Sequence, residues 1–478
     1  MKKWMIRALS ALLIAAFLPV SVLADEYDLN EGSVTVSTTK GADGSTQQKV
    51  THKDNTKPDS NPTITSNGQQ TDNTITINAG AGTTANVTIK DANISASSGK
   101  AAIKTGGEGN VNLNVEGTNT VSSGSNYAGV EKANAGNLTI GSESGSGELT
   151  ANGGWHGAGI GGGHYRDAND ITITGGEVTA NGGDGAAGIG GGYYSYGKNI
   201  TISGGKVVAN GSGSAAGIGG GHYGNGSNIT ISGGEVTATG GDYGAGIGGG
   251  YYGNGSNITI SGGEVTATGG DCGAGIGGGY GRGGSNIAIS KDSQVEAVGG
   301  AVGGAGGSSD GCGAAIGNGG NNNRVNGSEI EPDTSGLYTT GKVERKRGDG
   351  TVLDTIIGTV EPPVEPEKSA SSEEEPDKRE PLYRVLNLDG SSLKHQAQKA
   401  DGVLALTAKA DGAILTGTLR ALGYLQNQGI EKITFTDGTH SAELVLAELI
   451  AKGQPEDVYV LTLGAENTLT LNGEAIDF

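Results

Sequence analysis

The strongest constraint on this chain is a glycine-rich phrase that recurs at an interval of 29 residues. In residues 244–271 the phrase reads GAGIGGGYYGNGSNITISGGEVTATGGD. A fixed period of this length indicates a stacked architecture, in which each copy packs against its two neighbours. Two sets of isoleucines follow the interval without deviation: Ile160, Ile189, Ile218, Ile247 and Ile276, and Ile171, Ile200, Ile229, Ile258 and Ile287.

Each copy contains three short strand-like pieces, at residues 245–247, 257–260 and 264–267 in the copy above. Alternation places Ile258 and Ile260 on one side of their strand and Thr259 on the other. The glycine-rich steps between the pieces suit turns, because glycine adopts positive φ angles at little cost. Three strands and three turns predict one coil of a parallel β-helix, with equivalent residues about 4.8 Å apart on successive coils. Crossovers between parallel strands favour the right-handed form.

Looser copies extend the repeat at residues 101–103, 128–130 and 314–316. We therefore predict an all-β fold, a parallel β-helix of about eight coils over residues 73–330. One coil buries about four large aliphatic side chains, worth roughly 1.5–3 kcal/mol each, against an ordering cost of about 1–2 kcal/mol per residue. A single coil cannot fold alone, so the phrase must be repeated. The fixed apolar spacing also argues against a disordered glycine-rich tract.

The flanking segments differ from the repeat in composition. Residues 1–24 read as a secretory signal peptide, with a basic start, an apolar run and a small-residue cleavage site. We predict a polar N-terminal segment or cap at 25–72, a β-hairpin end piece at 331–360 and an acidic, proline-containing linker at 361–381. Residues 382–478 alternate strand-like pieces with two helix-like pieces, TLRALGYLQNQG and AELVLAELIAKG, and are expected to form a small α+β domain.

Residues 73–323 resemble the right-handed, pectate-lyase-like parallel β-helix repeats of bacterial secreted and surface proteins. The motifs NITISGGEVTATGG and GAGIGGG carry this resemblance. It implies a secreted or surface-associated protein with a carbohydrate-binding or adhesive role. The resemblance is specific for architecture and not for activity, because the same fold supports lyases, hydrolases, adhesins and inert stalks.

The charge balance narrows the range of partners. The net charge is −20, and loss of Lys2, Lys3 and Arg7 with the signal peptide would make it −23. An acidic exported protein is a poor match for nucleic acid or for an anionic membrane surface. No stretch after the signal is apolar enough to suggest a transmembrane segment. We expect an extracellular monomer whose partner is a polysaccharide or a host or cell-surface glycan.

An aromatic step follows each GIGGG motif and is the best candidate for a binding surface. Stacked coils would align these side chains into a double file, which predicts a platform for the apolar faces of sugar rings. The alternative is that the files only shield the glycine-rich sheet or stack on one another. The proposed glycan-binding residues are Tyr165, Tyr193, Tyr194, Tyr223, Tyr251, Tyr252 and Tyr280.

Catalytic chemistry has little support in the sequence. Glycosidases need two carboxyl groups about 5–10 Å apart, whereas the acids here are sparse and better explained as solvated surface charges. His164 and His222 lie two coils apart, about 10 Å, which is too far to share a metal ion. We therefore expect no catalytic residues, no metal site and no cofactor. A polysaccharide-degrading enzyme, a stalk that displays the C-terminal domain, and an ice-binding face formed by the outward threonine rows remain alternatives.

Two cysteines occupy matching positions in the repeat. Cys272 precedes Ile276 by four residues, and Cys312 precedes Ile316 by the same number. In-register neighbours on adjacent coils lie about 4.8 Å apart, within the span of a disulfide. We predict that Cys272 and Cys312 form a disulfide in the oxidising extracellular environment, with a pair of free thiols as the alternative.

Overall fold

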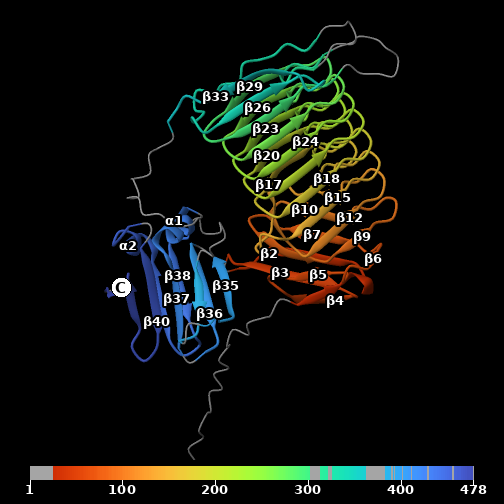
Figure 1. Cartoon of the computed structure of the whole chain (residues 1–478). Helices are drawn as coiled ribbons and strands as arrows, with labels where there is room; N and C mark the ends of the chain where they lie inside the picture. The colour runs from red at the N-terminus through yellow and green to blue at the C-terminus, as the bar shows by residue number, and fades with distance from the viewer. Residues whose placement is uncertain are drawn as a thin grey trace, which may run out of the picture. The chain divides into compact units, whose positions relative to one another are not determined.

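A computed structural model describes residues 25–301, 313–320, 326–361 and 383–476, apart from residues 43, 389, 390, 392, 401, 411, 428, 429, 455 and 456. The chain divides into two compact units, Met1–Pro366 and Glu367–Phe478. The first unit is a solenoid in which the chain coils through three sheets in turn (Figure 1). The two units are described separately below.

The first sheet carries the regular Ile-Thr-Ile strands. Equivalent isoleucines pair in parallel from coil to coil, as in Ile200 with Ile229 and Ile229 with Ile258. These side chains are fully buried, and the intervening threonines face outward. The strands, in spatial order, are β1 (Glu26–Asp28), β5 (Thr63–Thr65), β8 (Thr84–Lys90), β11 (Asn110–Glu116), β14 (Leu138–Gly141), β17 (Ala168–Ile173), β20 (Gly197–Ile202), β23 (Gly226–Ile231), β26 (Gly255–Ile260) and β29 (Gly284–Ile289).

Half of the strands described in the second sheet are two-residue Ile-Gly strands. Gly190 shows why glycine follows the isoleucine, since its φ is 138° and a Cβ there would collide with the backbone carbonyl of Gly219 on the next coil. The strands, in spatial order, are β31 (Ile316–Gly317), β28 (Ile276–Gly277), β25 (Ile247–Gly248), β22 (Ile218–Gly219), β19 (Ile189–Gly190), β16 (Ile160–Gly161), β13 (Val130–Glu131), β10 (Ile103–Gly107), β7 (Ile75–Ala79), β2 (Val34–Lys40), β3 (Thr46–His52) and β4 (Asn55–Pro58).

The third sheet contains the Glu-Val-Thr-Ala strands, whose valine and alanine side chains point into the same continuous core. A single 3₁₀ turn, η1 (Leu29–Glu31), precedes the solenoid's first long strand. The strands of this sheet, in spatial order, are β33 (Val352–Ile357), β32 (Lys342–Lys346), β30 (Gln294–Val298), β27 (Glu264–Thr268), β24 (Glu235–Thr239), β21 (Lys206–Asn210), β18 (Glu177–Asn181), β15 (Glu148–Asn152), β12 (Thr118–Ser122), β9 (Asn93–Ser95) and β6 (Gln70–Thr71).

The solenoid makes about 11 turns, more than the eight coils expected from the repeat. The additional turns lie toward the N-terminus, where β1, β2, β5 and β6 from residues 25–72 join the three sheets. Their spacing is irregular. Val34 pairs with Ile75, 41 residues later, whereas Ile75 pairs with Ile103, 28 residues later. These coils bury the same apolar core but lack the glycine-rich phrase, so the repeat alone does not reveal them.

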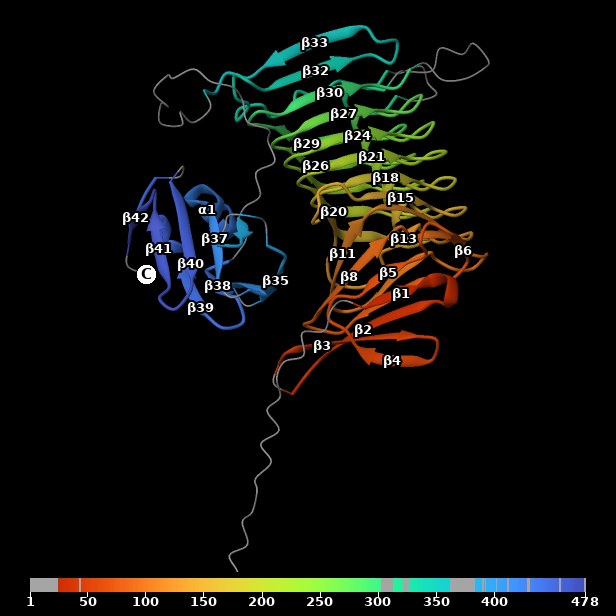
Figure 2. The same ribbon diagram turned by 60° about the horizontal axis from the view of Figure 1, so that its bottom comes forward.

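Antiparallel strands close both ends of the solenoid (Figure 2). At the N-terminal end, β3 pairs with β2 and β4 pairs with β3. At the C-terminal end, β33 turns back along β32, which itself pairs in parallel with β30. A hairpin is therefore present within residues 331–360, where one was expected, and its first strand also continues the third sheet.

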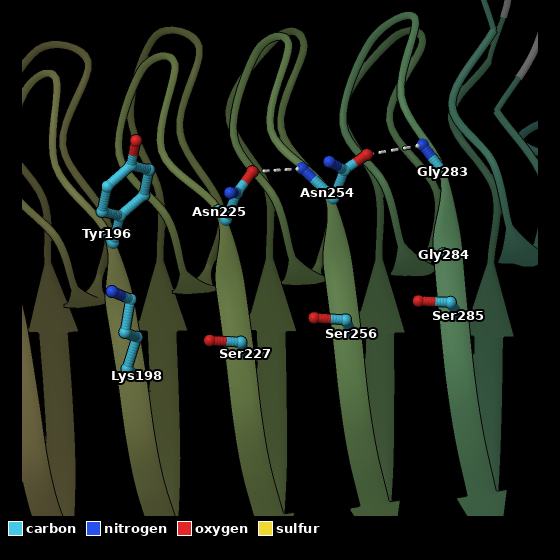
Figure 3. Close-up of a pocket in the computed structure, with 9 residues that line it drawn as sticks. All are labelled: Tyr196, Lys198, Asn225, Ser227, Asn254, Ser256, Gly283, Gly284 and Ser285. Atoms are coloured by element: carbon cyan, nitrogen blue, oxygen red, sulfur yellow. Dashed lines mark hydrogen bonds between the residues drawn. The ribbon is translucent and has the colours of Figure 1, made fainter.

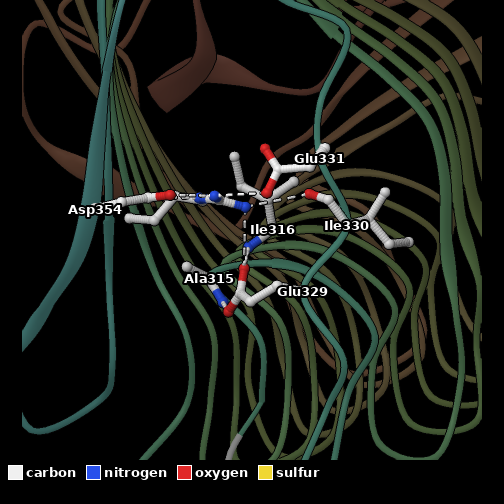
Figure 4. A network of polar contacts seen from close by, with 7 residues as sticks. Ala315, Ile316, Glu329, Ile330, Glu331 and Asp354 are labelled. Atoms are coloured by element: carbon white, nitrogen blue, oxygen red, sulfur yellow. Dashed lines mark hydrogen bonds and ion pairs between the residues drawn. The ribbon is translucent and has the colours of Figure 1, made fainter.

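A polar network beneath this hairpin caps the last strand of the second sheet (Figure 4). The carboxylate of Glu329 accepts hydrogen bonds from the backbone N–H groups of Ala315 and Ile316, at 2.7 and 3.1 Å. The guanidinium of Arg345, only 5% exposed, forms ion pairs with Glu329 and with the two other carboxylates drawn in Figure 4, those of Glu331 and Asp354. Backbone donors that would otherwise bind a further coil are thus satisfied within the chain.

The C-terminal unit has its own core and contains two small sheets and two helices. Helix α2 is shorter than the sequence suggested, because residues 441–445 pair with β38 as a strand and bury Leu444. One sheet consists of β34 (Arg384–Leu386), β37 (Ala413–Thr418), β40 (Val458–Leu463), β41 (Thr468–Leu471) and β42 (Glu474–Ala475). The other consists of β35 (His395–Ala400), β36 (Val403–Ala408), β38 (Lys432–Thr436) and β39 (Ser441–Val445). The helices are α1 (Leu419–Asn427) and α2 (Leu446–Ile450).

Candidate functional site

The aromatic residues predicted to align do align, in the loops that lead from the second sheet to the first. Two consecutive positions in each loop generate two files. The outer file consists of Tyr165, Tyr194, Tyr223 and Tyr252, and the inner file consists of Tyr193, His222, Tyr251 and Tyr280. All seven proposed tyrosines therefore lie in one continuous cluster.

Rings of the outer file stack on one another along the solenoid axis. Centroids of successive rings are 5.6, 5.3 and 5.8 Å apart, and the ring planes deviate by 20°, 6° and 11°. The first ring, Tyr165, is 69% exposed, whereas the others are 37–44% exposed. Because each interior ring turns a face toward the ring of the next coil, the file presents mainly ring edges and hydroxyl groups to solvent.

Rings of the inner file support the outer file from behind. Tyr193 and His222 are almost parallel at 5.0 Å, and Tyr193 meets Tyr194 edge to face at 4.4 Å. Burial, reinforced by Tyr194, raises the pKa of Tyr193 to about 12, and the pKa of Tyr251 rises to about 12 for the same reasons, with Tyr252 as the neighbour. Burial also lowers the pKa of His222, so this imidazole is neutral at pH 7.

The outer file has an unusual backbone conformation. Tyr165, Tyr194, Tyr223 and Tyr252 have φ angles of 58°, 61°, 59° and 52°. For a bulky residue this left-handed region costs about 1–2 kcal/mol relative to the right-handed region. The equivalent position in the next coil is Gly281, with a φ of 65°. The loop therefore forms with glycine, yet four successive coils place a tyrosine there.

Sequence reasoning missed several exposed aromatic residues around the files. Trp155 is 60% exposed beside His156, and Tyr196 and Tyr243 are each 38% exposed. Trp155 is the only tryptophan after the predicted signal peptide, and this rarity could have identified it from the sequence. Its indole meets His156 at a tilt of 50°, so its faces are not stacked against that neighbour.

A groove of about 510 Å³ lies beside the loops, where the strands of the first sheet begin (Figure 3). It crosses β20, β23, β26 and β29, and the labelled side chains project from one side of these strands. Tyr196 and Lys198 lie at one end, with the lysine Nζ 4.9 Å from the centroid of the tyrosine ring. The other side chains that line it are Asn225, Ser227, Asn254, Ser256 and Ser285.

Comparison with known families identifies the repeat. The Beta helix repeat family matches five successive copies, at residues 144–164, 171–193, 200–222, 229–251 and 258–280. The chain is a parallel β-helix repeat protein. No curated protein and no solved structure matches it. Each of the last four matches ends at an inner-file residue, Tyr193, His222, Tyr251 or Tyr280, and each outer-file tyrosine lies directly after a matched segment.

The remaining site predictions have different outcomes. Cys272 is buried, but Cys312 lies outside the described residues, so the disulfide stays a prediction. Among the described residues, no three His, Cys, Asp or Glu side chains converge in a way that could hold a metal ion. In the same part of the chain, no helix is both long and apolar enough to cross a bilayer.

Proposed function

We propose that this protein is exported and that its β-helix binds a linear polysaccharide, in solution or on a cell surface, along the outer file. The observation that carries the proposal is the left-handed backbone of Tyr165, Tyr194, Tyr223 and Tyr252. The coil sets a left-handed backbone at this position, which glycine adopts without strain, and bulky residues kept at such strained positions are concentrated at functional sites. Gly281 supports the view that the coil does not need a tyrosine there.

Ring stacking alone gives little reason to keep these tyrosines. Each stacked pair contributes about 0.5–1.5 kcal/mol, which is close to the strain of about 1–2 kcal/mol in each left-handed tyrosine. Strain thus cancels the stacking contribution, and what still favours tyrosine over glycine is the apolar area that each ring buries, about 1–2 kcal/mol per ring. A file of exposed edges and hydroxyl groups, one per coil, instead suits a ligand that repeats along the axis and carries many hydroxyl groups.

The geometry modifies how sugar rings would bind. Interior tyrosine faces are turned toward neighbouring rings, so contacts to ring edges and phenol hydroxyls are favoured over flat stacking along the file. Trp155 is the exposed aromatic best placed for flat stacking, because its only described ring contact is the tilted one with His156.

The test replaces Tyr194 and Tyr223 together by glycine in the secreted chain. Glycine relieves the backbone strain and so offsets part of the lost packing, and we expect the melting temperature to fall by less than about 8 °C. Binding to polysaccharides on a glycan array is expected to fall at least tenfold, or about 1.4 kcal/mol. The control is Thr237→Ala with Thr266→Ala on the outward side of β24 and β27, which should leave both quantities unchanged.

The outcomes separate the proposal from the stalk alternative. The proposed site would be contradicted if the tyrosine variant bound polysaccharide as tightly as the wild-type chain, or if the wild-type chain bound no polysaccharide. A melting temperature that falls by more than about 8 °C would instead assign the tyrosines to packing. In either case the solenoid would be better described as a stalk for the C-terminal unit.

A further inference from the structure

The groove beside the outer file continues onto a further coil. A second hollow, of about 360 Å³, shares Asn254 and Gly283 with the groove and extends past Arg282 to Asn318. Arg282 also lies over the ring of Tyr252, with its Cζ 5.7 Å from the ring centroid, and its Nε donates a hydrogen bond to the Tyr252 carbonyl at 3.1 Å. This arginine therefore connects the extended groove to the outer file.

The charge of this extended groove is opposite to that of the chain. The chain has a net charge of −20, with 51 acidic residues. Among the described residues that line the two hollows, none is acidic, and the two charged ones are Lys198 and Arg282. Neither cation forms an ion pair within the described part of the chain, and each instead lies over a tyrosine ring. Acidic residues resume one coil before Tyr196, where Asp167 accepts a hydrogen bond from the Tyr196 N–H at 2.8 Å.

The floor of the groove offers hydrogen-bonding groups that the described structure leaves unused. The Asn225 and Asn254 side-chain oxygens accept backbone N–H groups of the next coil, at 2.8 and 3.2 Å, as the dashed lines in Figure 3 show. Their amide NH₂ groups have no partner in the described residues, and neither do the hydroxyls of Ser227 and Ser256. Ser227 pairs in register with Ser256, and Ser256 with Ser285, so one hydroxyl recurs on each coil.

We propose that the extended groove between Lys198 and Arg282 binds an anionic linear glycan, one that carries carboxylate or sulfate groups. This inference rests on the proposed function and names its ligand class. The two cations lie three coils apart, about 14 Å, so they would contact separate acidic groups on one extended chain. The amide and hydroxyl donors between them bind the intervening sugar hydroxyls. No carboxylate lines the groove, so an anionic chain bound there avoids the electrostatic repulsion that it would meet elsewhere on this acidic protein.

The experiment measures binding of the secreted chain to matched pairs of polysaccharides. The probes are several carboxylated and sulfated polysaccharides, each with its carboxyl-reduced or desulfated form, together with neutral polymers. We expect binding to the acidic members and at least a tenfold loss on the matched neutral forms. Lys198→Gln with Arg282→Gln should cause a loss of similar size, and binding should weaken as the salt concentration rises.

The control is Lys206→Gln, which removes a lysine of the same coil on the outward side of β21, where it faces Glu177 at 3.9 Å. It should leave binding unchanged. Equal binding to acidic and neutral forms, or no effect of the double substitution, would overturn the anionic ligand and leave the proposed function standing. If none of the probes binds, both proposals are contradicted. Circular dichroism confirms that each variant is folded.

Discussion

At the scale of single residues, the two aromatic files have different roles: the inner file packs behind and supports the outer file, and the outer file is exposed to solvent. Inner-file rings are half-buried or, at Tyr280, 3% exposed, and they hold outer-file rings through edge-to-face contacts. Gly185 shows how closely the inner file is packed, because a Cβ at this position would collide with the ring of Tyr193. Support of this kind restricts the rotamers of the outer tyrosines before any ligand arrives, which reduces the entropy lost on binding.

The raised pKa values of Tyr193 and Tyr251 make stability depend on pH in the alkaline range. Both groups have a pKa of about 12 in the folded protein, against about 10 when unfolded. Between these values the unfolded state releases the protons first, so the free energy of unfolding should fall as the pH rises above 10. Urea denaturation at pH 9 and pH 11 measures this change. Tyr193→Phe with Tyr251→Phe keeps the stacks and should make the decrease smaller, whereas an unchanged pH dependence would contradict it.

At the scale of elements, the last coil depends on the network around Arg345. Its guanidinium is buried against three carboxylates, and one of these, Glu329, also accepts the two backbone N–H groups at the edge of β31. Hydrogen bonding to Asp354, opposed by burial, raises the pKa of Arg345 further above its already high value, so the charge is permanent. The sheet edge, the hairpin and the segment between them are thus joined at one side chain.

Arg345→Met should loosen this end of the solenoid without affecting its middle. Removing the guanidinium leaves three carboxylates that repel one another, but these are 33–77% exposed, so the cost should be about 1–3 kcal/mol, less than for a fully buried pair. Hydrogen exchange should show loss of protection in β31, β32 and β33, with protection retained in β20 and β23. Lys342→Met, on the same strand, removes a 44% exposed lysine and is the control, with an expected effect below about 1 kcal/mol. Uniform loss of protection along the solenoid would contradict a local cap.

The sequence predicted the regular coils well, because an unbroken 29-residue interval fixes which residues pair. Ile189 pairs with Ile218, and even the displaced Ile316 pairs with Ile276 as expected. The first coils were not predicted because burial selects apolar side chains without fixing coil length, as the 41-residue interval from Val34 to its partner Ile75 shows. The left-handed tyrosines could not be predicted from residue type, since loop closure sets their φ angles. The only sequence clue was Gly281 at the equivalent position.

At the scale of the whole molecule, a solenoid must prevent its ends from acting as open sheet edges. Exposed edges present unpaired backbone donors and acceptors and promote association between copies. Here β4 ends in Pro58, which lacks a backbone donor, and β33 covers β32 at the opposite end. Among the described residues, a core of 55 buried side chains runs between these two closures, from Tyr27 to Val343. Closure therefore explains how stacked coils, which could in principle continue indefinitely, form a unit of defined length.

Two truncated chains test whether β33 keeps the solenoid from associating end to end. Residues 25–361 retain the hairpin, whereas residues 25–346 end with β32 and expose its outer edge, where Val343 had paired with Ile356. Both lack the C-terminal unit, which has a separate core, so they differ only in the closure.

Sedimentation velocity should show a monomer for the longer chain. The shorter chain should form species that grow with concentration, because an open parallel edge accepts strands from other copies. Circular dichroism must show that both remain β-structured. A folded shorter chain that stays monomeric at every concentration would mean that the cap on β31, where the Glu329 carboxylate binds two backbone N–H groups, is sufficient to prevent end-to-end association.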